Sequence, residues 1–179
     1  MKTKKFFYAL AALFCCLSLT SCGDDDDDIL PAEKTITSAT FYVTLNPSNE
    51  QLDVSDILLD YTDDQGADLE SVVNKTPCYL KVDIKKLPVN GKFTYSCKKK
   101  EGAVIDNDAI YKMSRQVLIK IDVTYSDGKT ATIRDDAQLP FNDNSQTMKG
   151  SKVEDWMTRH ATLATKSISL DAKGSFSGN

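Results

Sequence analysis

Hydrophobic and polar residues alternate along most of the chain from residue 35 to residue 170. Because successive side chains of a β-strand point to opposite sides, this alternation is typical of strands that bury one face. The stretch 117–125 shows it most clearly. The pattern predicts strands over residues 35–45, 57–62, 69–73, 78–85, 93–97, 117–125, 130–134 and 165–170.

Turn-forming residues separate these predicted strands, at 46–49, 63–66, 88–91 and 126–128, and all five prolines fall between strands. Proline cannot donate to a β-ladder, so its placement supports the strand boundaries. The Asp-Gly pair in the last of these segments predicts a two-residue hairpin turn. Many short strands with turns between them predict a mainly β fold, namely an antiparallel, immunoglobulin-like β-sandwich over residues 35–171.

One segment near the C-terminus has helical spacing instead. Val153, Trp156, Met157 and His160 recur at intervals of three and four residues, which predicts one short amphipathic helix over about 152–160. Ser151 and Glu154 have the spacing of a capping box, in which the serine accepts from an amide and the glutamate reaches back.

Three further segments lack a regular pattern. Residues 102–115 and 140–150 are predicted to be loops, and loops on a rigid scaffold are where recognition residues commonly lie. Residues 172–179 are predicted to be a frayed tail.

The N-terminal residues follow a different plan. Three lysines occur within residues 1–5, and a nearly uninterrupted apolar run follows over 6–19. This run is shorter than the roughly twenty residues that a membrane-spanning helix needs. The layout is that of a secretory signal peptide, predicted to be residues 1–21 and to be removed.

The residues around the predicted cleavage site resemble the lipobox of bacterial lipoproteins. The motif is Leu19-Thr20-Ser21-Cys22. By this resemblance, signal peptidase cuts before Cys22 after the cysteine has acquired lipid, and Cys22 becomes the first residue of the mature chain. The alternative is an ordinary cysteine near a conventional cleavage site. Several acyl chains anchor a protein far more firmly than one, so the mature protein is expected to be tethered to a membrane.

An acidic run follows directly, made of Asp24, Asp25, Asp26, Asp27 and Asp28. Adjacent like charges repel one another, so residues 22–34 are predicted to form a flexible tether. The run also resembles the surface-export signal of Bacteroidetes lipoproteins. That resemblance implies a lipid-anchored outer-membrane protein displayed at the cell surface.

The rest of the chain is almost neutral. Setting the signal peptide and the acidic run aside leaves 19 Lys and Arg against 21 Asp and Glu. This balance gives no electrostatic footprint for nucleic acid, which is therefore not an expected partner. The remaining length suits one domain with a sizeable core.

Catalytic and cofactor motifs do not emerge from the sequence. The single histidine, His160, has no acid or nucleophile at a useful helical spacing. No paired-histidine motif, nucleophile elbow or glycine-rich phosphate loop occurs, so we expect no cofactor and no enzyme. Two carboxylates brought together by folding would be the exception.

Acidic residues are the candidates for a metal site, and two cysteines are the candidates for a disulfide. Acidic residues are dense around the turn at 63–66, but they do not fit a calcium loop, and aspartate is favoured in turns. A turn role is therefore predicted and no metal site is assigned, with a calcium site as the alternative. Cys78 and Cys97 have two interpretations, a disulfide in an oxidising compartment or two small buried side chains. The acidic residues around the turn at 63–66, mentioned above, are Asp60, Asp63, Asp64, Asp68 and Glu70.

The function expected from these features is a membrane-anchored, non-catalytic binding or accessory module for a glycan or an outer-membrane protein. Exposed aromatic side chains would carry glycan stacking, and the candidates are Tyr42, Tyr79, Tyr111 and Trp156, although Trp156 also fits a core position. The alternatives are a structural or adhesive surface subunit and a small carboxylate hydrolase.

Overall fold

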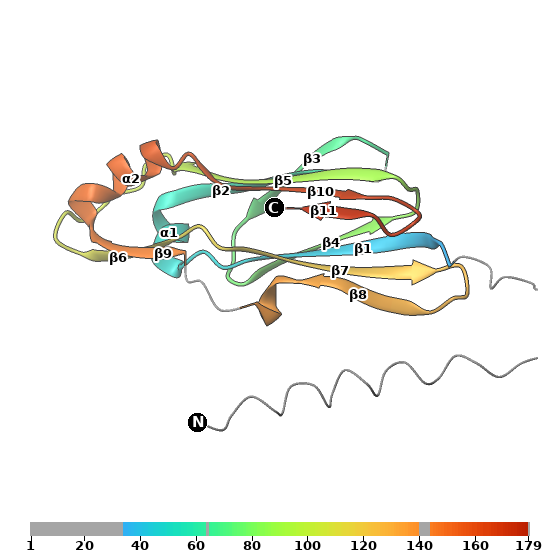
Figure 1. Ribbon diagram of the computed structural model, residues 1–179. Helices are drawn as coiled ribbons and strands as arrows, with labels where there is room; N and C mark the ends of the chain where they lie inside the picture. Colours follow the sequence, from blue (N-terminus) through green and yellow to red (C-terminus); the bar gives the residue numbers. More distant parts are fainter. Residues whose placement is uncertain (1–33, 64, 140–143, 179) are drawn as a thin grey trace, which may run out of the picture. The chain divides into compact units, whose positions relative to one another are not determined.

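A computed structural model describes residues 34–63, 65–139 and 144–178 (Figure 1). They belong to one compact unit, Glu33–Asn179. The predicted signal peptide, the lipidation site Cys22 and the five aspartates lie outside the described residues. Within the described ranges, no helix is both long and apolar enough to cross a membrane.

The fold is mainly β, and every strand pairing is antiparallel. One sheet has the order β4-β1-β7-β8, a second the order β11-β10-β5-β2-β3, and a small third sheet pairs β6 with β9 (Figure 1). The strands are β1 (Ile36–Leu45), β2 (Ser55–Thr62), β3 (Asp68–Val73), β4 (Cys78–Ile84), β5 (Val89–Lys99), β6 (Ile110–Ser114), β7 (Val117–Tyr125), β8 (Thr130–Asp135), β9 (Ser145–Lys149), β10 (Thr162–Leu170) and β11 (Phe176–Gly178).

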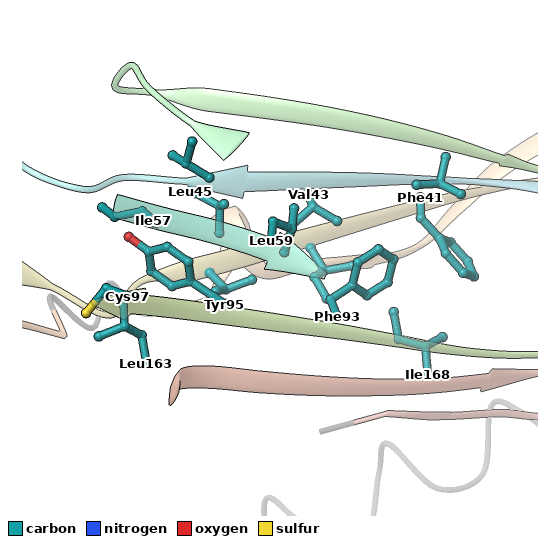
Figure 2. Packing of buried hydrophobic residues seen from close by; sticks show 14 of the residues in the cluster. Phe41, Val43, Leu45, Ile57, Leu59, Phe93, Tyr95, Cys97, Leu163 and Ile168 are labelled. Atoms are coloured by element: carbon teal, nitrogen blue, oxygen red, sulfur yellow. The ribbon is translucent and has the colours of Figure 1, made fainter. Parts of the chain in front are cut away.

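The core fills the space between the two large sheets. Side chains of β1 on one sheet and of β2 and β5 on the other point toward one another (Figure 2). Phe41 and Phe93 meet edge to face across this space, with ring centroids 6.1 Å apart. The buried positions fall on the parity that the alternation predicted, which confirms the expected sandwich at the level of two packed antiparallel sheets.

The hairpin between β7 and β8 is present, but its loop differs from the prediction. Tyr125 donates its N–H to Lys129 O at 2.9 Å, which leaves three loop residues, not two. Gly128 adopts φ of +78°, the left-handed conformation that closes a three-residue hairpin. Asp127 Oδ1 accepts from Lys129 N at 3.0 Å.

The segment between β4 and β5 was predicted as a turn over 88–91. It instead carries the chain from one large sheet to the other, because β4 and β5 belong to different sheets. β5 already begins at Val89, so Asn90 and Gly91 lie within the strand. Alternation shows which positions are buried in each strand, but not which sheet a strand joins.

The predicted C-terminal helix is present as α2 (Val153–Arg159), but its capping box is not formed. Lys152 occupies the N-cap position, and no side chain caps the helix there. A 3₁₀ turn, η2 (Gly150–Lys152), precedes the helix, and the Glu154 carboxylate contacts the Lys99 ammonium at 2.5 Å.

Further helical segments were not predicted. A second helix, α1 (Asn49–Val54), starts where only a turn was expected, and Ser48 Oγ caps it by accepting from Gln51 N at 3.0 Å. A short 3₁₀ turn, η1 (Asp136–Gln138), follows β8.

Two predicted loops and the predicted frayed tail contain strands. β6 lies within 102–115, β9 lies within 140–150, and the two pair with each other, so a long-range contact orders both segments. In the tail, β11 pairs with β10, with Leu170 opposite Phe176. The sequences of β6, β9 and β11 alternate little between apolar and polar residues, so the local pattern does not reveal these strands or their partners.

A candidate binding face

The four aromatic candidates divide into two buried and two exposed side chains. Trp156 is 2% exposed and Tyr111 is 9% exposed, so both belong to the core. Trp156 Nε1 donates to Gln146 Oε1 at 2.8 Å, and Tyr111 Oη accepts from Asp106 N at 3.1 Å. Tyr42 and Tyr79 are 36% and 70% exposed. Burial removes Tyr111 and Trp156 from the surface candidates.

The two exposed tyrosines lie on the same side of the same sheet. Thr44 is the register partner of Tyr79, and Tyr42 lies two residues before Thr44 on β1, so both tyrosine side chains project from the outer side. We call this side the tyrosine face. Its residues are Thr40, Tyr42, Thr44, Tyr79, Lys81, Asp83, Leu118, Lys120, Asp122, Thr132 and Asp135.

Tyr42 is the centre of this face. Its register partners are Lys81 on β4 and Lys120 on β7, so a lysine stands on each side of the ring. Lys120 Nζ lies 5.4 Å from the centroid of the Tyr42 ring, within the range of a cation–π contact.

Each of these lysines is paired with an aspartate two residues further along its own strand. Lys81 Nζ lies 3.0 Å from Asp83 Oδ1, and Lys120 Nζ lies 3.0 Å from Asp122 Oδ2. Residues two apart in a strand project from the same side, which is why the pairs can form. The result is two parallel ion pairs with the Tyr42 strand between them.

Threonine hydroxyls complete the polar network. Thr40 Oγ1 donates to Asp83 Oδ1 at 3.0 Å, and Thr132 Oγ1 donates to Asp122 Oδ1 at 2.6 Å. Both aspartates are therefore held by one lysine and one threonine.

These contacts shift the protonation equilibria of the four charged groups. The pKa of Asp83 is lowered, first by the hydrogen bond from Lys81 and then by that from Thr40. The pKa of Asp122 is lowered, first by the hydrogen bond from Thr132 and then by that from Lys120. The pKa values of Lys81 and Lys120 are raised, chiefly by hydrogen bonds to their aspartates. All four groups stay charged over the physiological range.

Two shallow hollows adjoin Tyr42. One extends toward β8 and is lined by Tyr42, Thr44, Leu118, Lys120 and Asp135. The other lies beside the second ion pair and is lined by Thr40, Tyr42, Asp122, Thr124, Thr130 and Thr132. The face thus offers an aromatic ring between hollows whose walls carry hydroxyl and charged groups.

The outer side of the other large sheet has different chemistry. Serine and asparagine side chains of β10, β11 and β5 line one hollow, among them Asn90, Ser169 and Ser177. A second hollow contains Asp60 and Glu70, which are direct register partners on β2 and β3. Two carboxylates opposite one another repel, unlike the paired charges of the tyrosine face.

The histidine and the turn aspartate considered above make contacts typical of structural residues. His160 stacks on Trp156 with ring centroids 4.7 Å apart, and His160 Nδ1 lies 2.9 Å from Trp156 O. Asp63 Oδ1 accepts from Gln65 N and Ala67 N, as expected for a turn aspartate. Over the described ranges, no group of three or more His, Cys, Asp or Glu side chains is placed to hold a metal ion.

The disulfide interpretation of the cysteine pair is not supported. Cys78 and Cys97 are free thiols, and they belong to strands of different sheets. Burial raises the pKa of the Cys97 thiol to about 11, which keeps it protonated. Cys97 is a small core residue, as the second interpretation expected of both cysteines, whereas Cys78 is only partly buried.

Sequence reasoning missed the charged residues that surround Tyr42. Lys81, Asp83, Lys120 and Asp122 alternate with core residues in the strands predicted at 78–85 and 117–125, and this alternation does place them outward. What the sequence does not show is the register that puts Tyr42 between them.

Comparison with protein-family models, curated proteins and solved structures finds no match to the chain.

Proposed function

We propose that this chain is a lipid-anchored, non-catalytic binding module that presents the tyrosine face to a ligand. The observation that carries the proposal is the placement of Tyr42 and Tyr79 on one exposed face, next to paired charges and hydroxyl groups. The scaffold would be an immunoglobulin-like sandwich, in which strands of two packed antiparallel sheets hold the side chains of an outer face in a fixed arrangement.

The lipobox and the acidic run support attachment through Cys22 and display at the cell surface. The described chain begins at one end of the sandwich, where Lys34 Nζ contacts Asp127 Oδ2 at 2.8 Å and Ser126 N donates to Thr35 O at 2.8 Å. A tether would therefore join the domain at that end. The tyrosine face lies along the side of the sandwich. A tether attached at the end would therefore leave this face exposed to a ligand.

The anchoring part of the proposal is tested by fractionation. Cys22→Ala should release the protein from membranes into the soluble fraction. Replacing Asp24 to Asp28 by asparagine should leave the protein membrane-bound but protect it from protease added to intact cells. Unchanged membrane association of Cys22→Ala would refute lipid attachment, and unchanged protease accessibility of the asparagine variant would refute the export role.

The binding part is tested on the intact lipoprotein in detergent micelles. A glycan array and a pull-down from outer-membrane extracts should each be run with the native chain and with Tyr42→Ala and Tyr79→Ala. Thr165→Ala, which changes an exposed side chain of β10 in the other sheet, is the matched control. If ligand capture is equal in all four proteins, the tyrosine face is not the binding surface.

Asp83 and Asp122 of the tyrosine face are poorly suited to act as general acids. A general acid needs a raised pKa, whereas the pKa values of Asp83 and Asp122 are lowered by their lysine and threonine partners. This supports a binding role for the face.

A carboxylate hydrolase is a second candidate because Asp60 and Glu70 face each other across β2 and β3 in an open hollow. Both side chains are exposed, and catalytic carboxyl pairs are usually tuned by burial or partners. Glycan cleavage by the native chain that is lost in Asp60→Asn and Glu70→Gln would establish this function in place of the first.

Strand addition is a third candidate. β3 is an edge strand with Leu69 and Val72 exposed, 41% and 62% respectively. Asp68 and Glu70 on the same strand act against it, because charged edge residues discourage pairing with another chain. A Val72→Lys variant that abolished assembly or adhesion would favour this role.

A further inference from the structure

From the charge arrangement of the tyrosine face we infer that its ligand is an uncharged carbohydrate chain, which crosses β4, β1 and β7 with sugar rings on Tyr79 and Tyr42. This inference rests on the proposed binding function of the face. It names the ligand class, which that proposal leaves open between glycan and protein.

The first argument is charge. The cations of the face are Lys81 and Lys120, with Lys85 close to Asp83 at its margin, and the carboxylates are Asp83, Asp122 and Asp135. Lys81 and Lys120 are already bound to aspartates in their own strands. An anionic ligand would have to displace these carboxylates, and a cationic one would have to displace the lysines. An uncharged ligand requires neither exchange.

The second argument distinguishes a sugar from a protein partner. The centre of a protein interface is depleted of charged residues, because burying ion pairs removes them from water at considerable cost. Here both ion pairs flank Tyr42 at the centre of the face. Sugar hydroxyls can replace water at these charges, donating to the aspartates and accepting from the lysines, so the pairs stay solvated by polar groups when the ligand binds.

The third argument is the order of groups across the strands. Tyr79 projects from the edge strand with 70% of its surface exposed, and Tyr42 is its diagonal neighbour on β1. Diagonal neighbours on one sheet face are about 7–8 Å apart, close enough to act on one extended ligand. The hollow beyond Tyr42 that is lined by Asp122, Thr130 and Thr132 continues the same diagonal toward β8.

The polar groups along this line are held in place before a ligand arrives. Thr40 and Thr132 donate their hydroxyl protons to Asp83 and Asp122, which leaves the threonine oxygens free to accept from ligand hydroxyls. Side chains fixed by partners lose less entropy on binding, so a flat site of this kind can bind a weakly interacting ligand.

The test uses the intact lipoprotein in detergent micelles and native electrophoresis through gels that contain a polysaccharide. The neutral probes are a β-glucan, a xylan, a mannan and a galactan, and the anionic probes are a polyuronan and a sulfated glycosaminoglycan. Any neutral probe that retards the protein is then compared with its carboxymethyl and diethylaminoethyl derivatives, which keep the backbone but add negative or positive charge.

We expect at least one neutral probe to retard the protein, and both charged derivatives of that probe to bind more weakly. Tyr79→Ala and Tyr42→Ala should each weaken binding by about tenfold, a loss in the range of well-placed aromatic contacts. Tyr79→Phe, which keeps the ring, and Thr165→Ala, on the other sheet, should stay within about twofold of the native chain. Raised ionic strength should leave the affinity for the neutral probe unchanged, since no net charge is neutralised.

The possible outcomes distinguish failure of the uncharged-ligand inference from failure of the proposed binding face. Retardation only by anionic probes, lost on raising the salt and in the tyrosine variants, would refute the uncharged ligand but retain the binding face. The same holds if no polysaccharide binds while the tyrosine variants lose capture of an outer-membrane protein. Retardation that is equal in the native chain and in both alanine variants would refute the face itself, and the inference with it.

Discussion

The two ends of the sandwich are built in different ways. At one end, which we call the hairpin end, the chain reverses through the short loops that join β2 to β3, β7 to β8 and β10 to β11 (Figure 1). At the other end, the capped end, α1, α2 and the β6-β9 sheet close the space between the large sheets. The loops of the hairpin end are closed by contacts between near neighbours in sequence, whereas the capped end is closed by contacts between remote segments.

The loops of the hairpin end repeat one local design. Each contains a glycine in the left-handed region, with φ between +78° and +87°, and an aspartate whose carboxylate accepts backbone amides within the same loop. Asp171 Oδ1, for example, accepts from Lys173 N at 2.9 Å and from Ser175 N at 2.8 Å. Such loops form wherever the right few residues follow one another.

The capped end depends on side chains that bridge distant segments. Gln51 of α1 is fully buried, accepting from Ser114 N at 2.8 Å and donating to Ser114 O at 3.2 Å. Trp156 of α2 donates to Gln146 of β9. Gly150 lies so close to the 106–109 segment that a Cβ there would be 1.8 Å from Asp106 O.

This difference indicates which parts of the domain should tolerate substitution and which should lose stability. Substitutions at the hairpin end disturb one loop, whereas substitutions at the capped end separate elements that have no other local reason to meet. We therefore expect substitutions at the capped end to lower the free energy of unfolding much more than substitutions at the hairpin end.

The largest effect is expected for Gly150→Ala. The added Cβ would overlap the Asp106 carbonyl, so the backbone must move and the β6-β9 sheet with it, at a cost of about 4 kcal/mol in the free energy of unfolding. Urea denaturation measures this loss. The neighbouring exposed Ser151→Ala is the control and should change little; equal stabilities for the two variants would show that the capped end is not tightly packed at Gly150.

A smaller but substantial effect is expected for Gln51→Ala. Removal of the amide leaves the N–H and C=O of Ser114 without these partners in a buried site, which should cost about 2–3 kcal/mol. Hydrogen exchange should report faster exchange of the Ser114 amide in the variant. Gln65→Ala, in an exposed turn of the hairpin end, is the matched control, and a loss as large as that of Gln51→Ala would contradict the comparison.

A weaker, pH-dependent effect is expected for Asp171→Ala at the hairpin end. The pKa of Asp171 is lowered, first by the amide hydrogen bond from Ser175. The folded state therefore favours the carboxylate, and its contribution is present above the ordinary aspartate pKa near 3.9 and lost as the pH falls through the lower folded pKa.

The measurement is thermal unfolding of the native chain and of Asp171→Ala at neutral pH and in acid. The native chain should be the more stable at neutral pH, and the gap should narrow in acid. A gap that widened as the pH fell would reverse the assigned sign.

The smallest effect is expected for Lys34→Ala. Lys34 is more than half exposed and pairs with Asp127 at 2.8 Å, and exposed ion pairs contribute little because water and salt screen them. Thermal unfolding should not distinguish the variant from the native chain at raised ionic strength. A clear loss that persisted in salt would mean that the start of the domain is held more firmly than this contact implies.

The sequence predicted the strands whose two sides differ clearly, and it placed Tyr42 and Tyr79 on outer sides. It did not predict β6, β9 or β11, because their sequences show little alternation: β9 and β11 contain no buried side chain, and β6 begins with the exposed Ile110. It placed a hairpin-like turn between β4 and β5, where the structure has a crossing between sheets. Only part of the candidate face could be predicted from the sequence. Its tyrosines were identified, but their lysine and aspartate neighbours were not.

The sequence by itself determined the mainly antiparallel β character, the parity of buried positions, the hairpin between β7 and β8 and the short helix at 153–159. Each follows from side-chain periodicity or from the backbone preferences of glycine, aspartate and proline within a few residues. Only the tertiary structure decided which strands are neighbours, and hence that Lys81 and Lys120 flank Tyr42. Register depends on free energies summed over many remote contacts, and no local segment contains that information.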